Sequence, residues 1–327
     1  YLRKKGLASA DKRSGRTTSQ GLVIPLTTAD KRTAAMVEVN CETDFVARNE
    51  DFAAFANKIA NLVLKTPSVK TAEDLNKMTV DGQPFEEFVK SKIATTGENI
   101  SVSRAEHLTF AAGQNGIFDT YVHGEGSIGV LVQVKAENEA AAKKSEVAHY
   151  AHEVALQVAA MNPMALSSDN ITQEVKTREL NIAVEKTKAE LIGKAVNKAL
   201  EKEKINPAHV DSEDHMKSNM EKGWIDQETV DKARKIIQTV SAEAAAAQDD
   251  KKIRSIAEGR LNKYFKENCL LDQAYVKDDK KSISDLTNEV SKAIGAKIEL
   301  VAYRRWARGE AAATEAAQHE HAAEASA

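Results

Sequence analysis

The sequence shows the same order of hydrophobic patterns twice, and this repeat limits the folds that the chain can adopt. Near the start, Gly21–Leu26 and Thr33–Asn40 predict two strands joined by a turn, and the second strand alternates with period two. Asn49 is a typical helix-capping residue, and after it the period becomes helical. The apolar positions of this helix are Phe52, Phe55, Ile59, Leu62 and Val63. Ile100–Leu108 then predicts a third strand.

The same order of elements returns later in the chain. Gly116–His123 and Ser127–Lys135 predict a second hairpin, and Lys297–Trp306 predicts its third strand. A helix follows the hairpin, with an apolar face made of Val147, Tyr150, Ala151, Val154, Val158 and Ala159. We therefore expect an α+β fold of two duplicated subdomains, each with an antiparallel sheet and helices.

A long helical segment interrupts the second copy. Asn170–Lys204 consists almost entirely of helix-forming residues, and Thr229–Phe265 has a helical apolar pattern. The sequence INPAHVDSEDH, residues 205–215, breaks the pattern between them. Two long amphipathic helices separated by a break predict an antiparallel coiled-coil arm inserted into the second subdomain.

Charge and cysteine content narrow the classes of function. The 327 residues carry 46 basic and 49 acidic side chains, a net charge of −3, whereas a dedicated nucleic-acid binder usually has a clustered basic excess. Two cysteines are too few for a disulfide framework and fit a reducing compartment. The sequence has no apolar run of the ~20 residues that a membrane-spanning helix needs.

Three motifs with catalytic or metal-binding associations have ordinary explanations. Gly124–Gly129 matches G-x-G-x-x-G, but a strand pattern follows where a dinucleotide site requires a helix, which favours a hairpin turn. His149 and His152 share a helix face without further ligands, and we interpret them as surface or boundary histidines. Cys41 has no partner base and is interpreted as a buried residue at a strand end. These residues indicate an interaction protein with no metal or cofactor, rather than an enzyme.

The junction Asn40–Phe52, with the sequence NCETDFVARNEDF, places a bulky aromatic beside an aspartate where the strand pattern becomes helical. Helix starts favour acidic residues for electrostatic reasons, so Asp44 alone indicates no chemistry. Phe45 has two interpretations, which the pattern leaves open. Its ring either packs under the following helix or projects into solvent.

Two segments closely resemble the elongation factor Ts family. They are Val37–Ala56, VEVNCETDFVARNEDFAAFA, and Ile256–Asp278, IAEGRLNKYFKENCLLDQAYVKD. The segments YVHGEGSIGVLVQV, VALQVAAMNPMAL and VAYRRWARGE follow the order of the family, so the resemblance covers nearly the whole chain. It implies binding of the GTPase elongation factor Tu in its GDP form, expulsion of GDP and entry of GTP. It also implies two related subdomains and a coiled-coil insertion.

The resemblance assigns the junction to the partner's Mg²⁺ site. By analogy with the family, this segment displaces Mg²⁺ from elongation factor Tu, and Asp44 and Phe45 wedge into the GTPase beside the ion. The residues that match the displacing segment are Thr43, Asp44, Phe45 and Val46.

The resemblance also implies partner contacts outside the junction. In the second subdomain these fall on Ile128, Gly129 and Gln157, although many relatives have histidine at the last position. The arm is expected to touch a further face of the partner. Residues 204–234 look inserted relative to many members of the family, with Trp224 as a local anchor.

The repeat and the resemblance together predict six segments. The family begins with a small helical domain, and only its last helix is matched here, which we interpret as truncation. The predicted segments are a remnant of that domain (1–16), core subdomain N (17–112), the first part of core subdomain C (113–169), the coiled-coil arm (170–268), the last part of subdomain C (269–308) and a disordered tail (309–327).

Two other functions compete with nucleotide exchange. A ribosome- or RNA-associated structural protein would use the arm and the basic, aromatic stretch Tyr303–Arg308, because such residues stack on bases. A nucleotide-using enzyme would bind GDP without a partner. We expect neither direct nucleic-acid nor membrane binding, and we expect the bacterial cytoplasm rather than an organelle.

Overall fold

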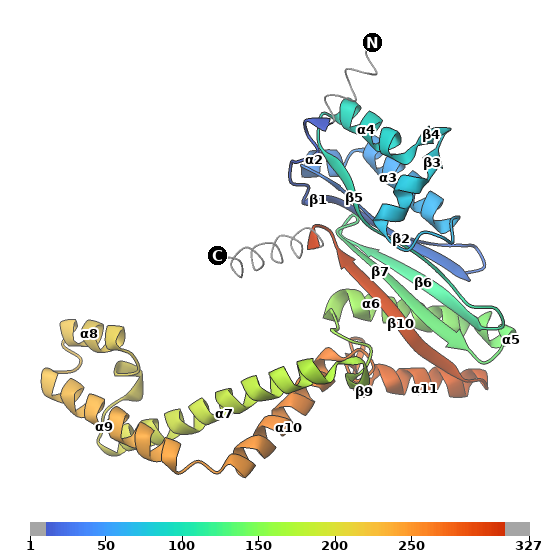
Figure 1. Ribbon diagram of the computed structural model, residues 1–327. Coiled ribbons are helices and arrows are strands. Elements are labelled where there is room, and N and C mark those ends of the chain that lie inside the picture. Colours follow the sequence, from blue (N-terminus) through green and yellow to red (C-terminus); the bar gives the residue numbers. More distant parts are fainter. Residues whose placement is uncertain (1–10, 311–327) are drawn as a thin grey trace. The chain divides into compact units, whose positions relative to one another are not determined.

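The computed structural model describes residues 11–310 (Figure 1). The chain forms two compact units: the first runs to Leu166 and resumes at Asn268, and the second is Ser167–Glu267. Most of the predicted N-terminal remnant, residues 1–10, and nearly all of the predicted tail, residues 311–327, lie outside the described residues.

The first subdomain is built on an antiparallel sheet with the strand order β1-β2-β5. These strands are β1 (Gln20–Thr27), β2 (Thr33–Cys41) and β5 (Ile100–Thr109). Nearly all of β2 is buried, as expected for a central strand that is covered on both faces. The elements between β2 and β5 are α2 (Asp44–Ala47), α3 (Glu50–Leu64), η1 (Ala72–Lys77), β3 (Thr79–Val80), β4 (Gln83–Pro84) and α4 (Phe85–Thr96).

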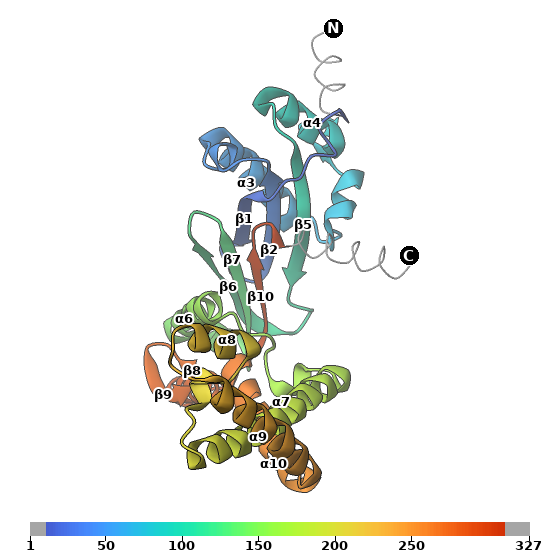
Figure 2. The ribbon, with the colours of Figure 1, turned by 90° about the vertical axis from the view of Figure 1, so that its left-hand side faces the viewer.

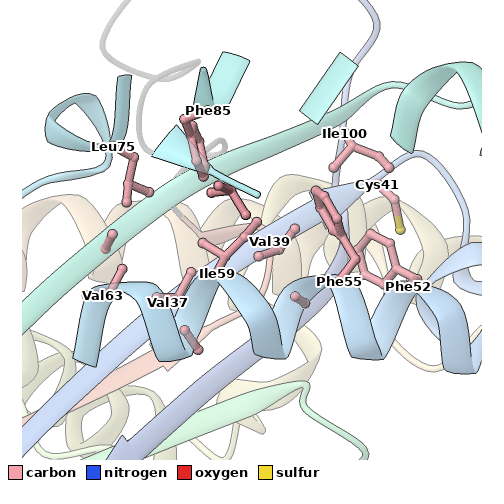
Figure 3. Close-up of a cluster of buried hydrophobic side chains, with 14 of the residues drawn as sticks. Val37, Val39, Cys41, Phe52, Phe55, Ile59, Val63, Leu75, Phe85 and Ile100 are labelled. Carbon is pink, nitrogen blue, oxygen red and sulfur yellow. The ribbon is translucent and has the colours of Figure 1, made fainter. Parts of the chain in front are cut away.

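The helix α3 covers one face of this sheet. Its apolar side chains meet those of β2 in a continuous core, which Figure 3 shows with Phe52, Ile59 and Val37 among its members. The ring of Phe55 stacks on that of Phe88 from α4, with 4.8 Å between the ring centroids. The spacing of apolar residues after Asn49 therefore predicted the buried face of α3 correctly.

The second subdomain has the same plan. Its antiparallel sheet has the strand order β10-β7-β6, with β6 at Asn115–His123, β7 at Ile128–Ala136 and β10 at Ile298–Ala307. Its helices are α5 (Glu139–Ala142), α6 (Ser145–Met161) and α11 (Ile283–Ile294), and a small hairpin is formed by β8 (Ala274–Tyr275) and β9 (Asp278–Ser282). The predicted α+β fold with two related subdomains is confirmed.

The two sheets share a buried apolar cluster that includes Val23, Met36, Phe118 and Leu131. The backbone N–H of Val23 donates to the carbonyl of Gly126 at 2.8 Å, which joins β1 to the turn between β6 and β7. Figures 1 and 2 show these strands lying side by side. The two sheets therefore pack against each other within the first unit.

A buried ion pair fixes the end of β10 to the first sheet. Glu38 is fully buried on β2, and its carboxylate accepts from the Arg104 guanidinium at 2.7 Å and from the backbone N–H of Gly309 at 2.7 Å. Arg104 also donates to the carbonyl of Ala307 at 2.9 Å. Such a charge is tolerated inside a protein because it is paired and hydrogen-bonded.

The second unit consists of helices. They are η2 (Ser168–Asn170), α7 (Gln173–Lys202), η3 (Pro207–His209), α8 (Glu213–Glu221), α9 (Gln227–Ala246) and most of α10 (Asp250–Asn268). α7 packs against α9 around a small apolar core of its own. The members of this core are Val196, Leu200, Ile205, Val210, Met216, Val230 and Ala233.

Two expectations about the arm were wrong in detail. The predicted helix Thr229–Phe265 is interrupted after Ala246, because Asp249 accepts from the backbone N–H of Lys251 at 3.0 Å and starts a new helix. Trp224 is not a buried anchor, since it is 61% exposed and its ring lies against that of His209, with 5.6 Å between the centroids. Buried apolar residues of the inserted segment, such as Met216, hold it to the arm instead.

Within residues 11–310, no helix is both long and apolar enough to cross a membrane.

Candidate partner-docking site

Two capped helix starts turn the chain at the junction between β2 and α3. Thr43 precedes the single turn of α2, and its hydroxyl accepts from the backbone N–H of Val46 at 3.4 Å. Asn49 then caps α3, with its side-chain oxygen accepting from the backbone N–H of Asp51 at 2.8 Å. Both caps satisfy N–H groups that a helix start leaves without partners, so the junction has a defined conformation.

Phe45 projects from this turn into solvent. It is 83% exposed, whereas Ala47 is buried and Val46 packs against the core of the first subdomain. One helical turn places residues 45 and 46–47 on different sides, so the inward packing of the latter two directs the ring outward. The structure thus decides between the two interpretations of Phe45 in favour of exposure.

Asp44 stands beside this ring with its charge accessible. Its side chain is 44% exposed, and one carboxylate oxygen lies 3.5 Å from a guanidinium nitrogen of Arg48. This pair joins partly exposed groups one turn apart, an arrangement that stabilises a helix by only about 0.3–0.5 kcal/mol. The junction therefore presents an apolar ring and a carboxylate together.

The three residues assigned to partner binding in the second subdomain lie mostly in the interior. Gly129 is buried on β7, and a Cβ added there would lie 2.5 Å from Cγ1 of Val23, so glycine allows the two sheets to approach. Ile128 is half-buried and packs against the core of the second subdomain. Burial gives Gly129 a structural role and leaves Ile128 partly accessible.

Gln157 is fully buried, and its amide is used inside the chain. The amide nitrogen donates to the carbonyl of Ala274 at 3.1 Å, and the amide oxygen accepts from the backbone N–H of Val276 at 2.9 Å. A direct contact between this side chain and a partner is therefore inconsistent with the structure of the free chain. Gln157 instead holds the β8–β9 hairpin, where Val276 is 47% exposed.

The motifs with catalytic associations keep their ordinary explanations. Cys41 is buried, its Sγ donates to the carbonyl of Thr43 at 3.2 Å, and burial together with the charge of Glu98 raises the pKa of its thiol to about 12. The glycines after His123 form the turn between β6 and β7 rather than a strand-to-helix loop. A thiol with this pKa stays protonated near neutral pH and is a poor nucleophile.

The histidine pair gives no metal site in the described part of the chain. His152 lies 3.0 Å from a carboxylate oxygen of Asp119, and His149 is exposed. Among residues 11–310, no group of three or more histidine, cysteine, aspartate or glutamate side chains is arranged to hold a metal ion.

Comparison with known proteins decides the family. A family model described as elongation factor TS matches residues 42–213 and 215–310. The chain is 38% identical to elongation factor Ts of Bacteroides thetaiotaomicron over 305 residues, which cover 93% of this chain and 87% of the relative. The chain belongs to the elongation factor Ts family. It is 40% identical over 308 residues to elongation factor Ts of Bacteroides fragilis, again covering 93% and 87%. It is 35% identical over 310 residues to that of Clostridium perfringens, covering 94% and 81%.

Membership in the elongation factor Ts family assigns the chain to translation elongation. It is a nucleotide-exchange factor for elongation factor Tu and not an enzyme. The resemblance of Val37–Ala56 to this family is therefore confirmed, and the named relatives are bacterial.

Sequence reasoning missed one residue of the candidate site. Glu98 lies beyond the end of α4, and its carboxylate contacts Thr43 at the start of α2. The signal in the sequence was GEN, residues 97–99, where a glycine ends a helix and two polar residues precede a strand. Such a pattern also occurs in ordinary loops, and only the structure brings Glu98 to the junction.

Proposed function

We propose that the chain docks its α2 junction on the GDP form of elongation factor Tu, beside the Mg²⁺ of that GTPase, and promotes GDP release by displacing the ion. The observation that carries the proposal is the exposure of Phe45, 83%, on a turn whose neighbouring residues are capped and buried. Leaving a phenylalanine side chain in water forgoes about 1.5–3 kcal/mol of burial. Burial of the ring in a partner would recover this free energy.

The displaced ion explains how a protein without catalytic groups accelerates release. In GTPases, Mg²⁺ bridges the nucleotide phosphates to the protein, so losing its coordination weakens GDP binding. A partner that binds the ion-free state lowers the affinity for GDP, and GDP lowers the affinity for that partner by the same factor. We assign the levering contact to Phe45 and place the carboxylate of Asp44 next to the ion.

The wedge requires a rigid support, and the junction supplies it. Val46 packs against the core of the first subdomain, and Ala47 is buried at the base of the same turn. Force on the ring is therefore carried into the sheet and α3 rather than absorbed by a loop. In this proposal Thr43 serves as the helix cap and Val46 as the support, with the ring and Asp44 as the contacting groups.

The remaining parts of the chain supply further contacts in this proposal. The second subdomain contributes the half-buried Ile128 and, through Gln157, the exposed Val276. The arm touches a further face of the partner. Because the named relatives are bacterial, we place the activity in the bacterial cytoplasm.

Nothing in the stretch Tyr303–Arg308 favours RNA binding over exchange. The guanidinium of Arg304 makes two hydrogen bonds of 2.8 Å to the carboxylate of Glu106, and Arg104 stacks on the ring of Trp306 at 4.6 Å. The Arg304 guanidinium and the Trp306 ring are therefore engaged inside the first unit rather than free to stack on bases.

The proposal is tested by the Phe45→Ala variant. We expect the rate of GDP release from elongation factor Tu, at saturating exchange factor, to fall by a factor of about ten to a hundred, because the contact made only in the ion-free state is lost. Stopped-flow measurement with a fluorescent GDP analogue gives this rate. Met161→Ala is the matched control, since it removes an exposed apolar side chain at the end of α6, outside the proposed contacts.

Two results decide the outcome of this experiment. Circular dichroism and the unfolding midpoint of Phe45→Ala should equal those of the unmodified chain, because the ring makes little contact within it. A variant that releases GDP at the original rate would contradict the wedge, and a variant that unfolds would show that Phe45 supports the fold.

A further inference from the structure

Two loops that are far apart in sequence are joined by hydrogen bonds to carboxylates, next to the turn that carries Phe45. The carboxylate of Glu98 accepts from the backbone N–H groups of Glu42 at 3.2 Å and Thr43 at 3.0 Å. Its other oxygen lies 2.5 Å from the hydroxyl of Thr43, which donates to it. Both oxygens of Glu98 are therefore occupied within the two residues that enter α2.

Glu42 in turn binds the loop that carries Glu98. The carboxylate of Glu42 accepts from the backbone N–H of Asn99 at 2.6 Å and lies 3.4 Å from the guanidinium of Arg16. The amide of Asn99 donates in turn to the carbonyl of Arg16 at 2.7 Å and to that of Ser14 at 3.2 Å. We name Glu42, Thr43, Glu98 and Asn99 the carboxylate clasp. It joins the ends of β2 and α4 to the segment before β1.

The clasp lies where α2 needs support from outside. A four-residue helix forms a single turn, and a single turn is unstable without external contacts. The hydroxyl of Thr43 accepts from the N–H of Val46 while it donates to Glu98, so one side chain joins the clasp to the helix cap. Charge-assisted bonds of this kind are shorter and stronger than neutral ones.

These hydrogen bonds indicate a role for Glu98 inside the chain rather than in contact with a partner. Both oxygens of Glu98 accept hydrogen bonds from the chain itself, so this carboxylate is directed toward Glu42 and Thr43 and used within the chain. Hydrogen bonds to the charged form stabilise a carboxylate. Three backbone N–H groups and Arg16 supply such bonds to Glu98 and Glu42.

We propose that Glu98 is a positioning residue of the exchange site: through Thr43 it sets the direction in which α2 presents Phe45. This inference depends on the proposed function, because it gives Glu98 an effect on GDP release only through the wedge. Glu98 touches neither the partner nor the ion in this proposal.

The test is a double-mutant cycle between Glu98 and Phe45. We expect Glu98→Ala to slow GDP release by a factor of about ten or more, because a misplacement of about 1 Å at a functional site reduces rates by up to about a hundredfold. In the Phe45→Ala background the same substitution should change the rate less than twofold, since no ring remains to be positioned. Glu98→Gln keeps one accepting oxygen and should give an intermediate rate.

A control and a second measurement keep the test independent of simple unfolding. Glu86→Ala removes a carboxylate from the exposed face of α4, where its partner is Lys90, and should leave the rate unchanged. Hydrogen exchange of the backbone should become faster in residues 42–47 of Glu98→Ala, with the protection of α3 retained. Release rates that fall by equal factors in both backgrounds would overturn the proposal.

Failure of the inference and failure of the proposed function give different results. If Phe45→Ala leaves GDP release unchanged, the wedge itself is wrong. If Phe45→Ala slows release but Glu98→Ala does not, the wedge stands and Glu98 does not position it. Unchanged hydrogen exchange in residues 42–47 of Glu98→Ala would also overturn the positioning role.

Discussion

At the scale of one residue, Gly129 was assigned to partner binding, but the packing of the fold also requires glycine at this position. Side chains of the first sheet lie against its backbone, where an added Cβ would lie 2.5 Å from Cγ1 of Val23 and 3.2 Å from the Cε of Met36. Sequence reasoning assigned Gly129 a contact because the family pattern does so. It had no means of seeing that another strand, about a hundred residues earlier, lies against this glycine.

Gly129→Ala is expected to lower the free energy of unfolding by about 1–3 kcal/mol, because a methyl group is forced into a filled interior. Gly193→Ala is the matched control. No atom lies within 4 Å of a Cβ added there on α7, so the better helix propensity of alanine should raise stability by up to about 1 kcal/mol. Urea unfolding followed by circular dichroism measures both. Equal losses in the two variants would contradict the packing argument.

At the scale of elements, strands were predicted better than helix ends. The predicted strand Ile100–Leu108 is observed as Ile100–Thr109, because period two marks a half-buried strand directly. The break after Ala246 was not predicted, since SAEAAAAQDD contains no glycine or proline and the alanines before the break favour helix. The exposure of Phe45 was equally beyond the pattern, because it depends on which way a single turn packs.

The β8–β9 hairpin offers a prediction about pH. Glu153 on α6 accepts hydrogen bonds from the Tyr275 hydroxyl and, at 2.7 Å, from the Lys277 ammonium. Burial alone would raise the pKa of Glu153, but these bonds outweigh it and place the pKa below its ordinary value of 4.5. A lowered pKa means that the contact stabilises the hairpin fully above pH 4.5 and is lost as the pH falls through the value in the folded chain.

Hydrogen-exchange protection of residues 274–282 should therefore fall at acidic pH before the sheets lose theirs. Glu153→Gln should lower this protection at neutral pH and remove most of its pH dependence. Glu146→Gln, on the exposed first turn of the same helix, should leave the dependence intact. A hairpin whose protection follows pH unchanged in Glu153→Gln would show that another group titrates there.

At the scale of the whole molecule, each compact unit has a core of its own. Leu200 is 1% exposed among the apolar residues of the second unit, and Phe52 is 1% exposed in the first subdomain. The two tryptophans of the sequence are divided between the units, with Trp224 in the second and Trp306 in the first. Each ring therefore reports on one unit, Trp306 through its stacking on Arg104 and Trp224 through its contact with His209.

We expect the two units to unfold as separate transitions, because each interior is formed by residues of its own unit. With Trp306→Phe as the background, Leu200→Ala should reduce the stability reported by Trp224 by about 2–5 kcal/mol, the usual result of emptying a buried site. The signal of Trp306, measured in a Trp224→Phe background, should keep its midpoint in Leu200→Ala and lose a similar amount in Phe52→Ala. If either substitution shifts the midpoints of both signals together, the chain unfolds as a single cooperative body. A partner that binds one unit would then also stabilise the other.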